Sequence, residues 1–255
     1  MTDTHSHLYL DQFRDDCDIL IENAVNAGIN KILLPNIDSR TIAPMTGLED
    51  RYPDIFRSMI GLHPGSVRED YEKELGTVRK WSRQNDFCAI GEIGVDLYWE
   101  DNKKYLREQT VAFREQLKIA KELDLPVVIH LRNSFREAIE IVKQEASPAL
   151  RGVFHCFSGN FSQASEAVGL GFYLGIGGVV TFKNSGLAAV VKQTDIKYIL
   201  LETDAPFLAP APFRGKRNIP EYLLYIAGEI ARLKGLTLGE VARITSENAI
   251  ALFRL

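Results

Sequence analysis

The sequence predicts an α/β fold, a single (β/α)8 barrel formed by residues 1–255. Short apolar runs rich in β-forming residues alternate with longer helical patterns along the whole chain, as in a parallel sheet with crossover helices. The chain has 255 residues, which is typical of α/β barrels that fold as one domain. No internal repeat, low-complexity tract or linker interrupts the alternation. We therefore expect a closed barrel in preference to an open doubly wound sheet.

Eight apolar runs are the predicted strands of this barrel. Each is short, rich in branched or aromatic residues, and separated from the next by enough chain for a crossover helix. In chain order they are Met1–Asp3, Lys31–Leu34, Phe56–Ile60, Cys88–Ile90, Val127–Ile129, Gly152–Phe154, Phe172–Leu174 and Tyr198–Leu201. Strict alternation of eight strands with helices is the pattern of a (β/α)8 barrel.

The predicted helices are clearest where apolar residues recur at helical spacing. This spacing runs over residues 106–120 and over residues 19–27, and the second pattern ends before the stop signal Gly28. Two more helices, near Tyr222–Leu233 and Leu238–Phe253, follow the last strand. The chain therefore ends in helices after the eighth strand.

Composition excludes a dedicated nucleic-acid binder with a broad basic surface. There are 30 Lys and Arg against 34 Asp and Glu, for a formal net charge of −4. Proteins dedicated to binding nucleic acid carry a basic patch or stripe on their surface. Any phosphate chemistry must therefore depend on a local site, whose positive charge can come from metal ions.

The cysteines and the N-terminus predict a cytoplasmic protein. Cys17, Cys88 and Cys156 are an odd number at wide spacing, so they form neither a disulfide framework nor a Cys-x-x-Cys site. The first residues lack the basic start and apolar stretch of a signal peptide, and no apolar run approaches the roughly 20 residues that span a bilayer. We expect no association with membranes and no obligate protein partner.

All five histidines follow predicted strands. His5 and His7 follow the first strand, His63 the third, His130 the fifth and His155 the sixth. In a barrel, the carboxyl ends of all strands meet at one face, where the active sites of such enzymes are assembled. We therefore expect the five imidazoles to be neighbours in space.

Two carboxylates are placed in the same way. Glu92 ends the fourth strand and Asp204 ends the eighth. A carboxylate at the mouth of a barrel needs a positive partner, and no matching set of lysines or arginines stands beside either residue. Divalent cations would balance both charges.

Each of these residues also has an interpretation without a metal. His5 and His7 share one side of an extended segment whether or not an ion is present, and His130 or His155 alone would be typical of a hydrogen-bonded core histidine. Their convergence favours two divalent ions, with Glu92 as a bridging ligand. The predicted ligands are His5, His7 and Asp204 for one ion, and His130 and His155 for the other, with Glu92 shared.

Six segments resemble the motif series of the TatD family of metal-dependent deoxyribonucleases, in order and spacing over the whole chain. They are Asp3-Thr4-His5-Ser6-His7, Gly61-Leu62-His63-Pro64, Gly91-Glu92-Ile93-Gly94-Val95-Asp96, His130-Leu131-Arg132, His155-Cys156-Phe157-Ser158-Gly159 and Glu202-Thr203-Asp204-Ala205-Pro206. A seventh segment, Arg214-Gly215-Lys216-Arg217-Asn218, also resembles one that follows the last strand in this family. The resemblance implies a TIM-like barrel of the amidohydrolase superfamily that hydrolyses phosphodiester bonds of DNA with divalent metals, often as an exonuclease.

The fourth strand distinguishes this chain from other binuclear members of that superfamily. Many of them bridge their metals with a carboxylated lysine, and here the strand ends in Glu92. Urease-like, dihydroorotase-like and phosphotriesterase-like interpretations are therefore disfavoured.

The expected catalytic residues are Asp204, Glu92 and His63. Asp204 can bind a metal through one oxygen and accept the proton of the attacking water through the other. His63 is not needed as a ligand, so we expect it to contact the phosphate or to protonate the leaving group; its alternative is a structural turn before Pro64. Glu202 and Asp96 can orient ligand histidines, or else cap loops.

Residues that could contact the substrate are less specific. Arg132, Lys183 and Arg214, together with Lys216 and Arg217, could bind flanking phosphates, or be ordinary solvated charges. Tyr98 and Trp99 could stack a base of a single strand, or pack within a loop.

Two other functions are compatible with the same residues. One is a metal-dependent hydrolase of a carboxylic ester, an amide or an aminoacyl-nucleic acid ester, since fold does not fix the substrate. The other is a non-catalytic metal-binding protein, against which Asp204 argues because a structural site would be closed by protein ligands. The metal is left open among Zn, Mg and Mn, because imidazoles suit zinc while carboxylates suit the other two.

Overall fold

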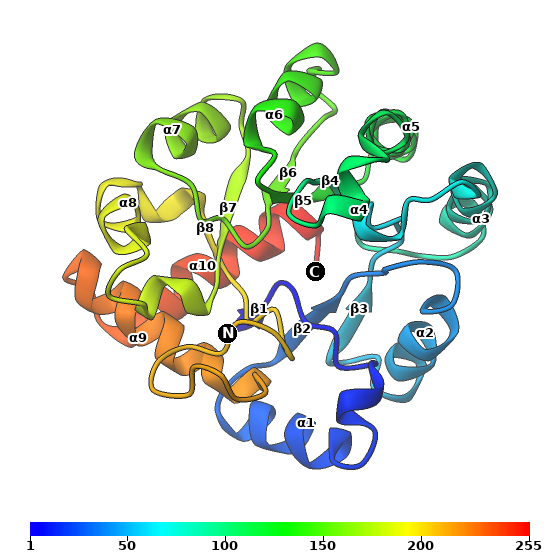
Figure 1. The fold of residues 1–255 in the computed structure, drawn as a ribbon. Coiled ribbons are helices and arrows are strands. Elements are labelled where there is room, and N and C mark those ends of the chain that lie inside the picture. Colours follow the sequence, from blue (N-terminus) through cyan, green and yellow to red (C-terminus); the bar gives the residue numbers. More distant parts are fainter.

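The computed structural model describes residues 1–255 as a ring of eight parallel strands with helices on its outer face (Figure 1). The strands follow one another round the ring in chain order. They are β1 (Thr2–Asp3), β2 (Lys31–Leu34), β3 (Phe56–Ser58), β4 (Ile90–Asp96), β5 (Val127–Arg132), β6 (Gly152–Phe154), β7 (Tyr173–Ile176) and β8 (Ile199–Leu201). The predicted α/β class and the strand count are confirmed.

Two single bridges join the strands into a closed ring. Strands β1 to β3 form one parallel sheet and β4 to β8 form another. Parallel bridges between Ile60 and Ile90 and between Ser6 and Ala205 connect these two sheets. The second junction is supported by the hydrogen bond from His7 N to Ala205 O, at 2.8 Å. The first and last strands of the chain are therefore neighbours.

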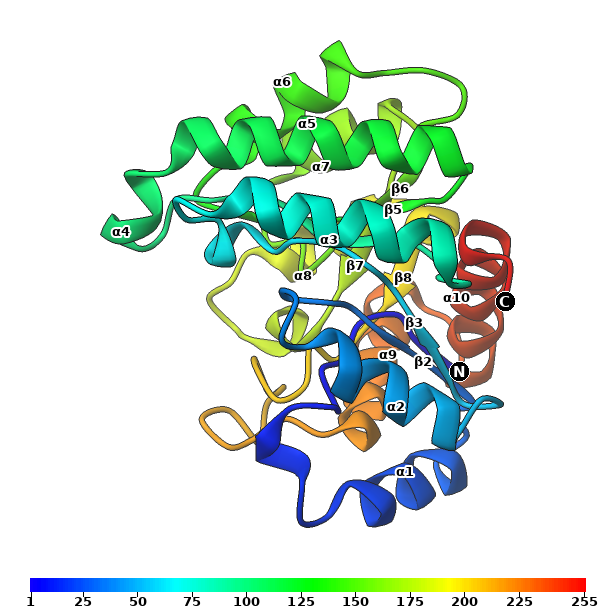
Figure 2. The same ribbon diagram turned by 90° about the vertical axis from the view of Figure 1, so that its right-hand side faces the viewer.

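Helices cover the outside of the ring and one of its ends. They are α1 (Cys17–Asn26), α2 (Ile42–Arg51), α3 (Tyr71–Gln84), α4 (Glu100–Lys103), α5 (Leu106–Leu123), α6 (Phe135–Gln144), α7 (Phe161–Gly169), α8 (Leu187–Gln193), α9 (Leu223–Lys234) and α10 (Leu238–Phe253). The last helix has the predicted bounds, and it begins at a capping box in which Thr237 and Glu240 satisfy each other's backbone N–H groups. Figure 2 shows α10 at the right, where the strands begin, and α4 at the opposite end.

The interior of the ring is apolar beneath α10 and polar at the other end. The apolar cluster consists of Leu33, Met59, Cys88, Ala89, Val128, Val153, Leu200, Ala249, Leu252 and Phe253. Side chains alternate along a strand, so a residue two positions further on faces the same interior nearer the carboxyl ends. Such pairs are Val128 with His130, Val153 with His155, and Leu200 with Glu202. The same face of each strand thus changes from core residue to polar site residue.

Two strands extend further than the sequence predicts. We expected strands over Cys88–Ile90 and Val127–Ile129, whereas β4 and β5 continue to Asp96 and Arg132 as a ladder that pairs Gly94 with His130. Glu92 and His130 therefore lie within strands and not after them. The ladder continues because each strand finds its hydrogen-bonding partner in the other, although their sequences lose apolar character.

β2 and β6 have the predicted bounds, and the bounds of the remaining strands differ by one or two residues. β3 ends at Ser58 and not Ile60, because Ile60 makes only the single bridge to the next strand. β7 begins at Tyr173 and ends at Ile176, against a predicted 172–174. β1 and β8 each begin one residue later than expected.

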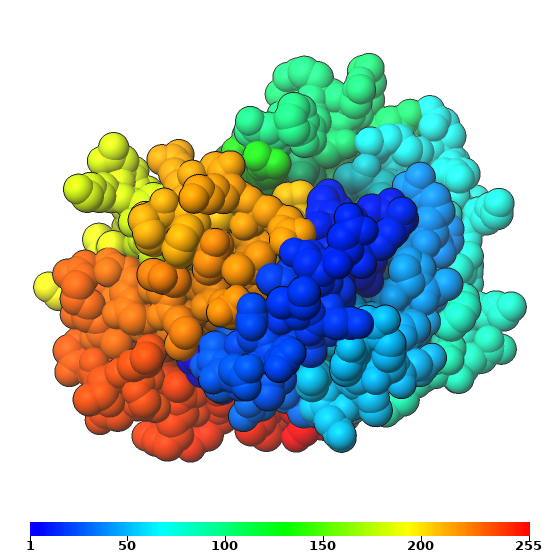
Figure 3. Space-filling model, turned by 90° about the horizontal axis from the view of Figure 1, so that it is seen from below, coloured from blue at the N-terminus to red at the C-terminus, as the bar shows by residue number.

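The N-terminal segment packs against the segment that follows β8. Figure 3 shows the blue start of the chain lying beside the orange residues near 210–230. Arg217 donates to Asp16 Oδ1 at 3.0 Å and also to the backbone oxygen of Gln12.

No helix of the fold has the length and apolar character needed to cross a bilayer.

Candidate metal centre

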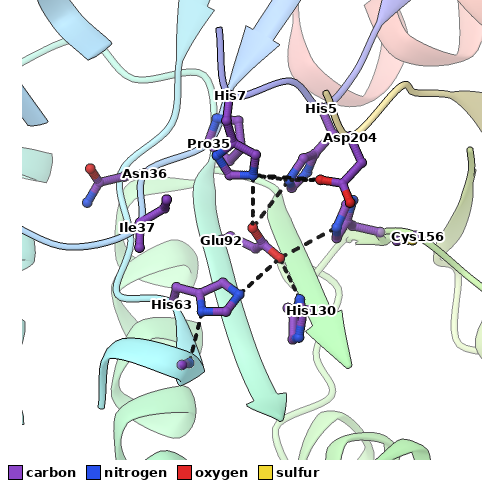
Figure 4. Close-up of polar contacts among 12 residues, drawn as sticks. His5, His7, Pro35, Asn36, Ile37, His63, Glu92, His130, Cys156 and Asp204 are labelled. Atoms are coloured by element: carbon purple, nitrogen blue, oxygen red, sulfur yellow. Dashed lines mark hydrogen bonds and ion pairs between the residues drawn. The ribbon is translucent and has the colours of Figure 1, made fainter. Parts of the chain in front are cut away.

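Glu92 lies at the centre of the polar end of the barrel. It stands at the register shift between Gly91 and Ile93 in the pairing of β4 with β5. A bulge of this kind re-aims a side chain, and here the carboxylate is directed into the ring interior, where the residue is only 2% exposed (Figure 4).

The two oxygens of Glu92 face different histidines. Its Oε2 lies 3.2 Å from His5 Nε2 and 3.7 Å from His7 Nε2. Its Oε1 lies 2.6 Å from His130 Nδ1 and 3.5 Å from His155 Nε2. The carboxylate therefore stands between two groups of imidazoles, as a bridging ligand would.

The first of these groups, called here the His5–His7 group, consists of His5, His7 and Asp204. The two Nε2 atoms are 3.3 Å apart, and Asp204 Oδ1 lies 3.8 Å from one and 3.7 Å from the other. Atoms that bind one tetrahedral ion at about 2.0–2.2 Å lie about 3.3–3.6 Å apart. With Glu92 Oε2, the group has the spacing of four ligand atoms around a shared cation.

The second group, called here the His130–His155 group, consists of those two histidines. Their ring centroids are 6.2 Å apart, and both rings face Glu92 Oε1. His155 also stacks on His5, with centroids 3.4 Å apart, so the two groups are in direct contact.

Asp3 fixes the loops that carry the first group. Its Oδ1 accepts hydrogen bonds from Thr203 N at 2.9 Å and His5 N at 3.3 Å, and its Oδ2 accepts from Thr203 Oγ1 at 2.6 Å. The backbone N–H of Asp204 then donates to His5 O at 2.9 Å. Asp3 was not among the predicted site residues, although a carboxylate in a short strand, two residues before His5, is a signal that could have identified it.

Tyr9 sets the orientation and tautomer of His7. The Tyr9 hydroxyl donates to the carbonyl oxygen of Pro35 at 2.6 Å, because a carbonyl can only accept. Its oxygen lies 2.9 Å from His7 Nδ1 and so accepts that N–H. The lone pair of His7 is left on Nε2, which faces Glu92 and Asp204. The sequence contained no signal for this contact, because Tyr9 lies outside every predicted strand.

The outer nitrogens of the second group face carboxylates. Asp96 Oδ2 lies 3.1 Å from His130 Nε2, which leaves His130 Nδ1 directed at Glu92. Glu202 Oε1 lies 3.1 Å from His155 Nδ1 and accepts a hydrogen bond from Cys156 N at 2.6 Å. Asp96 is hydrogen-bonded to His130, whereas His155 Nδ1 makes no hydrogen bond although Glu202 lies close to it. A carboxylate that is hydrogen-bonded to the second nitrogen of a ligand histidine orients the ring and raises its basicity.

Glycine makes room for the Glu202 carboxylate. A Cβ atom on Gly175 would lie 2.2 Å from Glu202 Oε2. Any side chain at this position of β7 would therefore push Glu202 away from His155.

His63 presents a hydrogen-bond donor to the centre. Its Nδ1 accepts from Gly65 N at 2.8 Å, so in the neutral ring the proton is on Nε2. That N–H points at Glu92 Oε1, 3.5 Å away, and the side chain is 20% exposed. Nε2 of this tautomer has no lone pair for a metal, and the contact of His63 with substrate stays a prediction.

Burial and neighbouring charges perturb the pKa values of the cluster. Burial lowers the pKa of both His5 and His7, which keeps these imidazoles neutral as metal ligands must be. Burial raises the pKa of Asp204 well above its ordinary value, and the charges of Glu92 and Glu202 raise it further. A cation would reverse this effect by stabilising the ionised carboxylate.

His130 differs from the other histidines of the cluster. Burial alone would lower its pKa, but hydrogen bonds to Asp96 and Glu92 outweigh burial and raise it to about 9. In His155, by contrast, burial dominates and lowers the pKa to about 4. The positive charge on His130 thus offsets part of the negative charge of the buried carboxylates when no metal is bound.

The donor set fits divalent metal ions. Imidazole nitrogens and carboxylate oxygens are the ligands of catalytic zinc sites, and such carboxylates also serve manganese and magnesium. The buried His5 Nδ1 and Glu202 Oε2 have no hydrogen-bond partner, so the cluster is not fully satisfied by its own contacts. All six predicted ligands and His63 are brought together.

The predicted phosphate-binding residues lie round the edge of this centre and are exposed. The guanidinium of Arg132 stacks on Tyr98, with Cζ 3.6 Å from the ring centroid, and Arg214 lies over Phe182. Lys183 is exposed in the loop after β7. Arg217 is different: its ion pair with Asp16 occupies the guanidinium, so it is not free for a phosphate.

Comparison with known proteins identifies relatives of the whole chain. The family model described as TatD related DNase matches residues 2–254. An uncharacterized metal-dependent hydrolase, YabD of Bacillus subtilis, is 39% identical over 99% of this chain and 98% of its own length. The 3'-5' ssDNA/RNA exonuclease TatD of Erwinia tasmaniensis is 32% identical over the full length of both chains.

A solved structure agrees with these relatives. The crystal structure of YjjV, a TatD homologue from Escherichia coli, is similar to this chain with a TM-score of 0.94 and 30% identity, covering 100% of this chain and 98% of its own. Sequence, fold and the arrangement of polar residues at the barrel mouth therefore agree. The chain is a metal-dependent hydrolase and belongs to the family of TatD-related DNases.

Proposed function

We propose that this protein removes nucleotides from the 3′ end of single-stranded DNA or RNA with the help of two divalent metal ions. The observation that carries the proposal is the position of Glu92, whose two carboxylate oxygens face separate groups of imidazoles 3.2–3.7 Å and 2.6–3.5 Å away. The named exonuclease activity of the Erwinia relative supports the choice of bond and polarity.

Each of the two ligand groups would bind one of the two ions. The His5–His7 group, which includes Asp204, would hold one ion and the His130–His155 group the other, with Glu92 shared. Divalent cations in such sites lower the pKa of water, so that a nucleophile is available at neutral pH, and neutralise charge on the phosphate. The protein residues then have to orient the phosphate and move protons.

Asp204 is the proposed general base. It belongs to the mouth of the barrel, its side chain is 11% exposed, and only one of its oxygens faces the histidines at the distances given above. The other oxygen is available to accept the proton of the attacking water. Attack on phosphorus then breaks the bond to the 3′ oxygen of the preceding nucleotide.

His63 is the proposed donor to the phosphate. Its Nε2–H is fixed by the Gly65 contact and projects towards Glu92 from the more open side of the cluster. From there it can donate a hydrogen bond to a non-bridging oxygen or to the departing 3′ oxygen, which takes its proton from water. Either role requires the donor tautomer that the structure shows.

The direct test is end-labelled digestion. Protein freed of metal is supplied separately with Zn²⁺, Mn²⁺ or Mg²⁺ and incubated with 5′-labelled single-stranded DNA, single-stranded RNA and blunt duplex. We expect a metal-dependent ladder that shortens from the 3′ end of the single strands, and none from an Asp204→Asn control.

A panel of small esters completes the experiment. Hydrolysis of carboxylic esters or aminoacyl esters by the metal-loaded protein, with no shortening of any oligonucleotide, would overturn the assignment to phosphodiesters. A ladder that begins at the 5′ end would overturn the polarity.

A further inference from the structure

Exposed aromatic residues gather at one edge of the metal centre, just after β4. Tyr98 and Trp99 are 45% and 59% exposed, and their rings meet edge to face with centroids 4.8 Å apart. Arg132 at the end of β5 lies with its guanidinium over Tyr98. The two exposed rings and the guanidinium form one contiguous surface, and stacked aromatic and guanidinium planes are surfaces on which unpaired bases bind.

This aromatic surface is fixed with respect to a predicted metal ligand. Asp96 accepts a hydrogen bond from Tyr98 N at 2.8 Å through Oδ1, while its Oδ2 faces His130 Nε2. Arg132 follows His130 by two residues on β5, so both side chains leave the same face of the strand about 7 Å apart. A base on this surface would therefore lie next to the reacting phosphate.

A second aromatic surface lies across the ring. Phe207, in the loop after β8, is 47% exposed, and its ring meets the edge of His7 with centroids 5.9 Å apart. Beyond it, Arg214 covers Phe182 at 4.6 Å, and the loops after β7 and β8 are joined by the hydrogen bond from Ala211 N to the Thr181 hydroxyl. In a ring of eight strands, β8 and β1 stand opposite β4 and β5 (Figure 1).

The charges on the two sides differ. Near Trp99 the lysines Lys103 and Lys104 are engaged by Glu100 and Asp101, at 2.6 Å and 2.7 Å. On the side of Phe207, the exposed Lys183, Arg214 and Lys216 form no ion pair in the structure. Three exposed cations without an ion pair therefore lie on the side of Phe207, where several successive phosphates could be bound, whereas on the side of Trp99 Arg132 stacks on Tyr98.

We propose that these two aromatic surfaces hold the unpaired bases on either side of the scissile bond, with the terminal base on Trp99 and the next base on Phe207. This proposal rests on the proposed exonuclease function and adds its specificity. The remainder of the strand leaves over Lys183, Arg214 and Lys216. Paired bases cannot separate onto surfaces on opposite sides of the mouth, so the arrangement selects single strands.

The test uses oligonucleotides that lack one base. Single-stranded DNA carries an abasic residue at the 3′-terminal position, at the penultimate position, or near its middle, and KM is measured for removal of the first nucleotide. We expect the terminal and penultimate abasic sites each to raise KM by about 5-fold to 100-fold, as loss of one stacked base does, and the internal site to have no effect.

Two variants assign the surfaces. Trp99→Ala should abolish the effect of the terminal abasic site alone, and Trp99→Phe should restore it in part. Phe207→Ala should abolish the effect of the penultimate site alone; because Phe207 touches His7, only this selective readout is informative. Ile250→Ala, which removes a 49% exposed side chain on α10 at the far end of the barrel, should retain both effects.

The outcomes separate this proposal from the function on which it rests. If neither oligonucleotides nor bis(4-nitrophenyl) phosphate is hydrolysed with any metal, the proposed function fails. If both are hydrolysed and abasic sites at either position leave KM unchanged, the stacking surfaces are wrong while the function stands. An exchange of the two variant patterns would overturn the assignment of terminal and penultimate bases.

Discussion

The two halves of the metal centre, the His5–His7 group and the His130–His155 group, differ in how closely the spacing of their ligand atoms matches the spacing around a bound ion. In the His5–His7 group, the facing atoms are held 3.2–3.8 Å apart and make no short contact with one another. In the His130–His155 group, His130 Nδ1 lies 2.6 Å from Glu92 Oε1. That separation is a hydrogen bond, and it is shorter than the spacing of two ligands round one tetrahedral ion.

The difference follows from where each half is anchored. The residues of the first half lie in backbone segments tied together by Asp3 and by hydrogen bonds between the loops after β1 and β8. His130 instead extends from a regular strand, and both nitrogens of its ring are hydrogen-bonded, to Asp96 at 3.1 Å and to Glu92 at 2.6 Å. We therefore expect the first ion to bind the His5–His7 group, and the second to bind more weakly because it must displace a hydrogen bond.

Glu92→Gln should have the largest effect, because Glu92 is the one residue shared by both halves. The amide loses the negative charge and one of the two strong donor oxygens, so both ions should bind more weakly. The loss should exceed the roughly 10–100-fold that removal of an outer hydrogen-bond partner causes. Calorimetric titration of metal-free protein would measure both steps. Weakening of one step alone would make Glu92 a terminal ligand of that half.

Replacing His130 and His155 with Ala should remove one half and leave the other. Elemental analysis should find two ions per chain in the parent protein and one in the folded double variant, and titration should retain only the tighter step. Circular dichroism establishes that the barrel is intact. Parental metal content in the folded variant would refute the assignment of these ligands, and loss of the tighter step would reverse the proposed order of binding.

Asp204→Asn should separate metal binding from chemistry within the His5–His7 group. The amide retains a donor oxygen, but it cannot accept a proton from water at neutral pH. Loss of a general base typically lowers the rate about 10²–10⁴-fold. Turnover should fall by this factor at saturating metal, while oligonucleotide affinity changes little. Recovery of parental turnover in excess metal would show that Asp204 only holds the ion.

The sequence predicted the metal centre better than it predicted the surroundings of that centre. The five histidines, Glu92 and Asp204 were all placed at one end of the barrel because each stands at or near the carboxyl end of an apolar run. The convergence of these residues depends only on the topology of the fold. It is unaffected by differences of several residues in the strand bounds, such as the extension of β4 to Asp96.

Contacts between loops were not predictable in the same way. The Tyr9 hydroxyl is held beside His7 by its hydrogen bond to Pro35, 26 positions away, and Asp3 reaches Thr203 because the ring closes on its first strand. The pairing of Arg217 with Asp16 depends on the same closure and removes a cation that the sequence offered for phosphate binding. Such contacts join residues up to 201 positions apart, and no local pattern records them.

Tyr9→Phe should have the smallest effect of the series and the most specific one. The ring and its packing are retained, but His7 Nδ1–H loses its acceptor and the imidazole is no longer held in the tautomer with its lone pair on Nε2. Loss of an outer partner of this kind weakens metal binding about 10–100-fold. The tighter titration step should weaken by that factor while the second step is unchanged. Nitrogen-15 NMR of the histidine rings in the metal-free protein reports the tautomer directly. If the His7 ring of the variant stays protonated on Nδ1 alone and both metal-binding steps keep the parental affinity, the Tyr9 hydroxyl has no role in orienting His7 and only donates to Pro35.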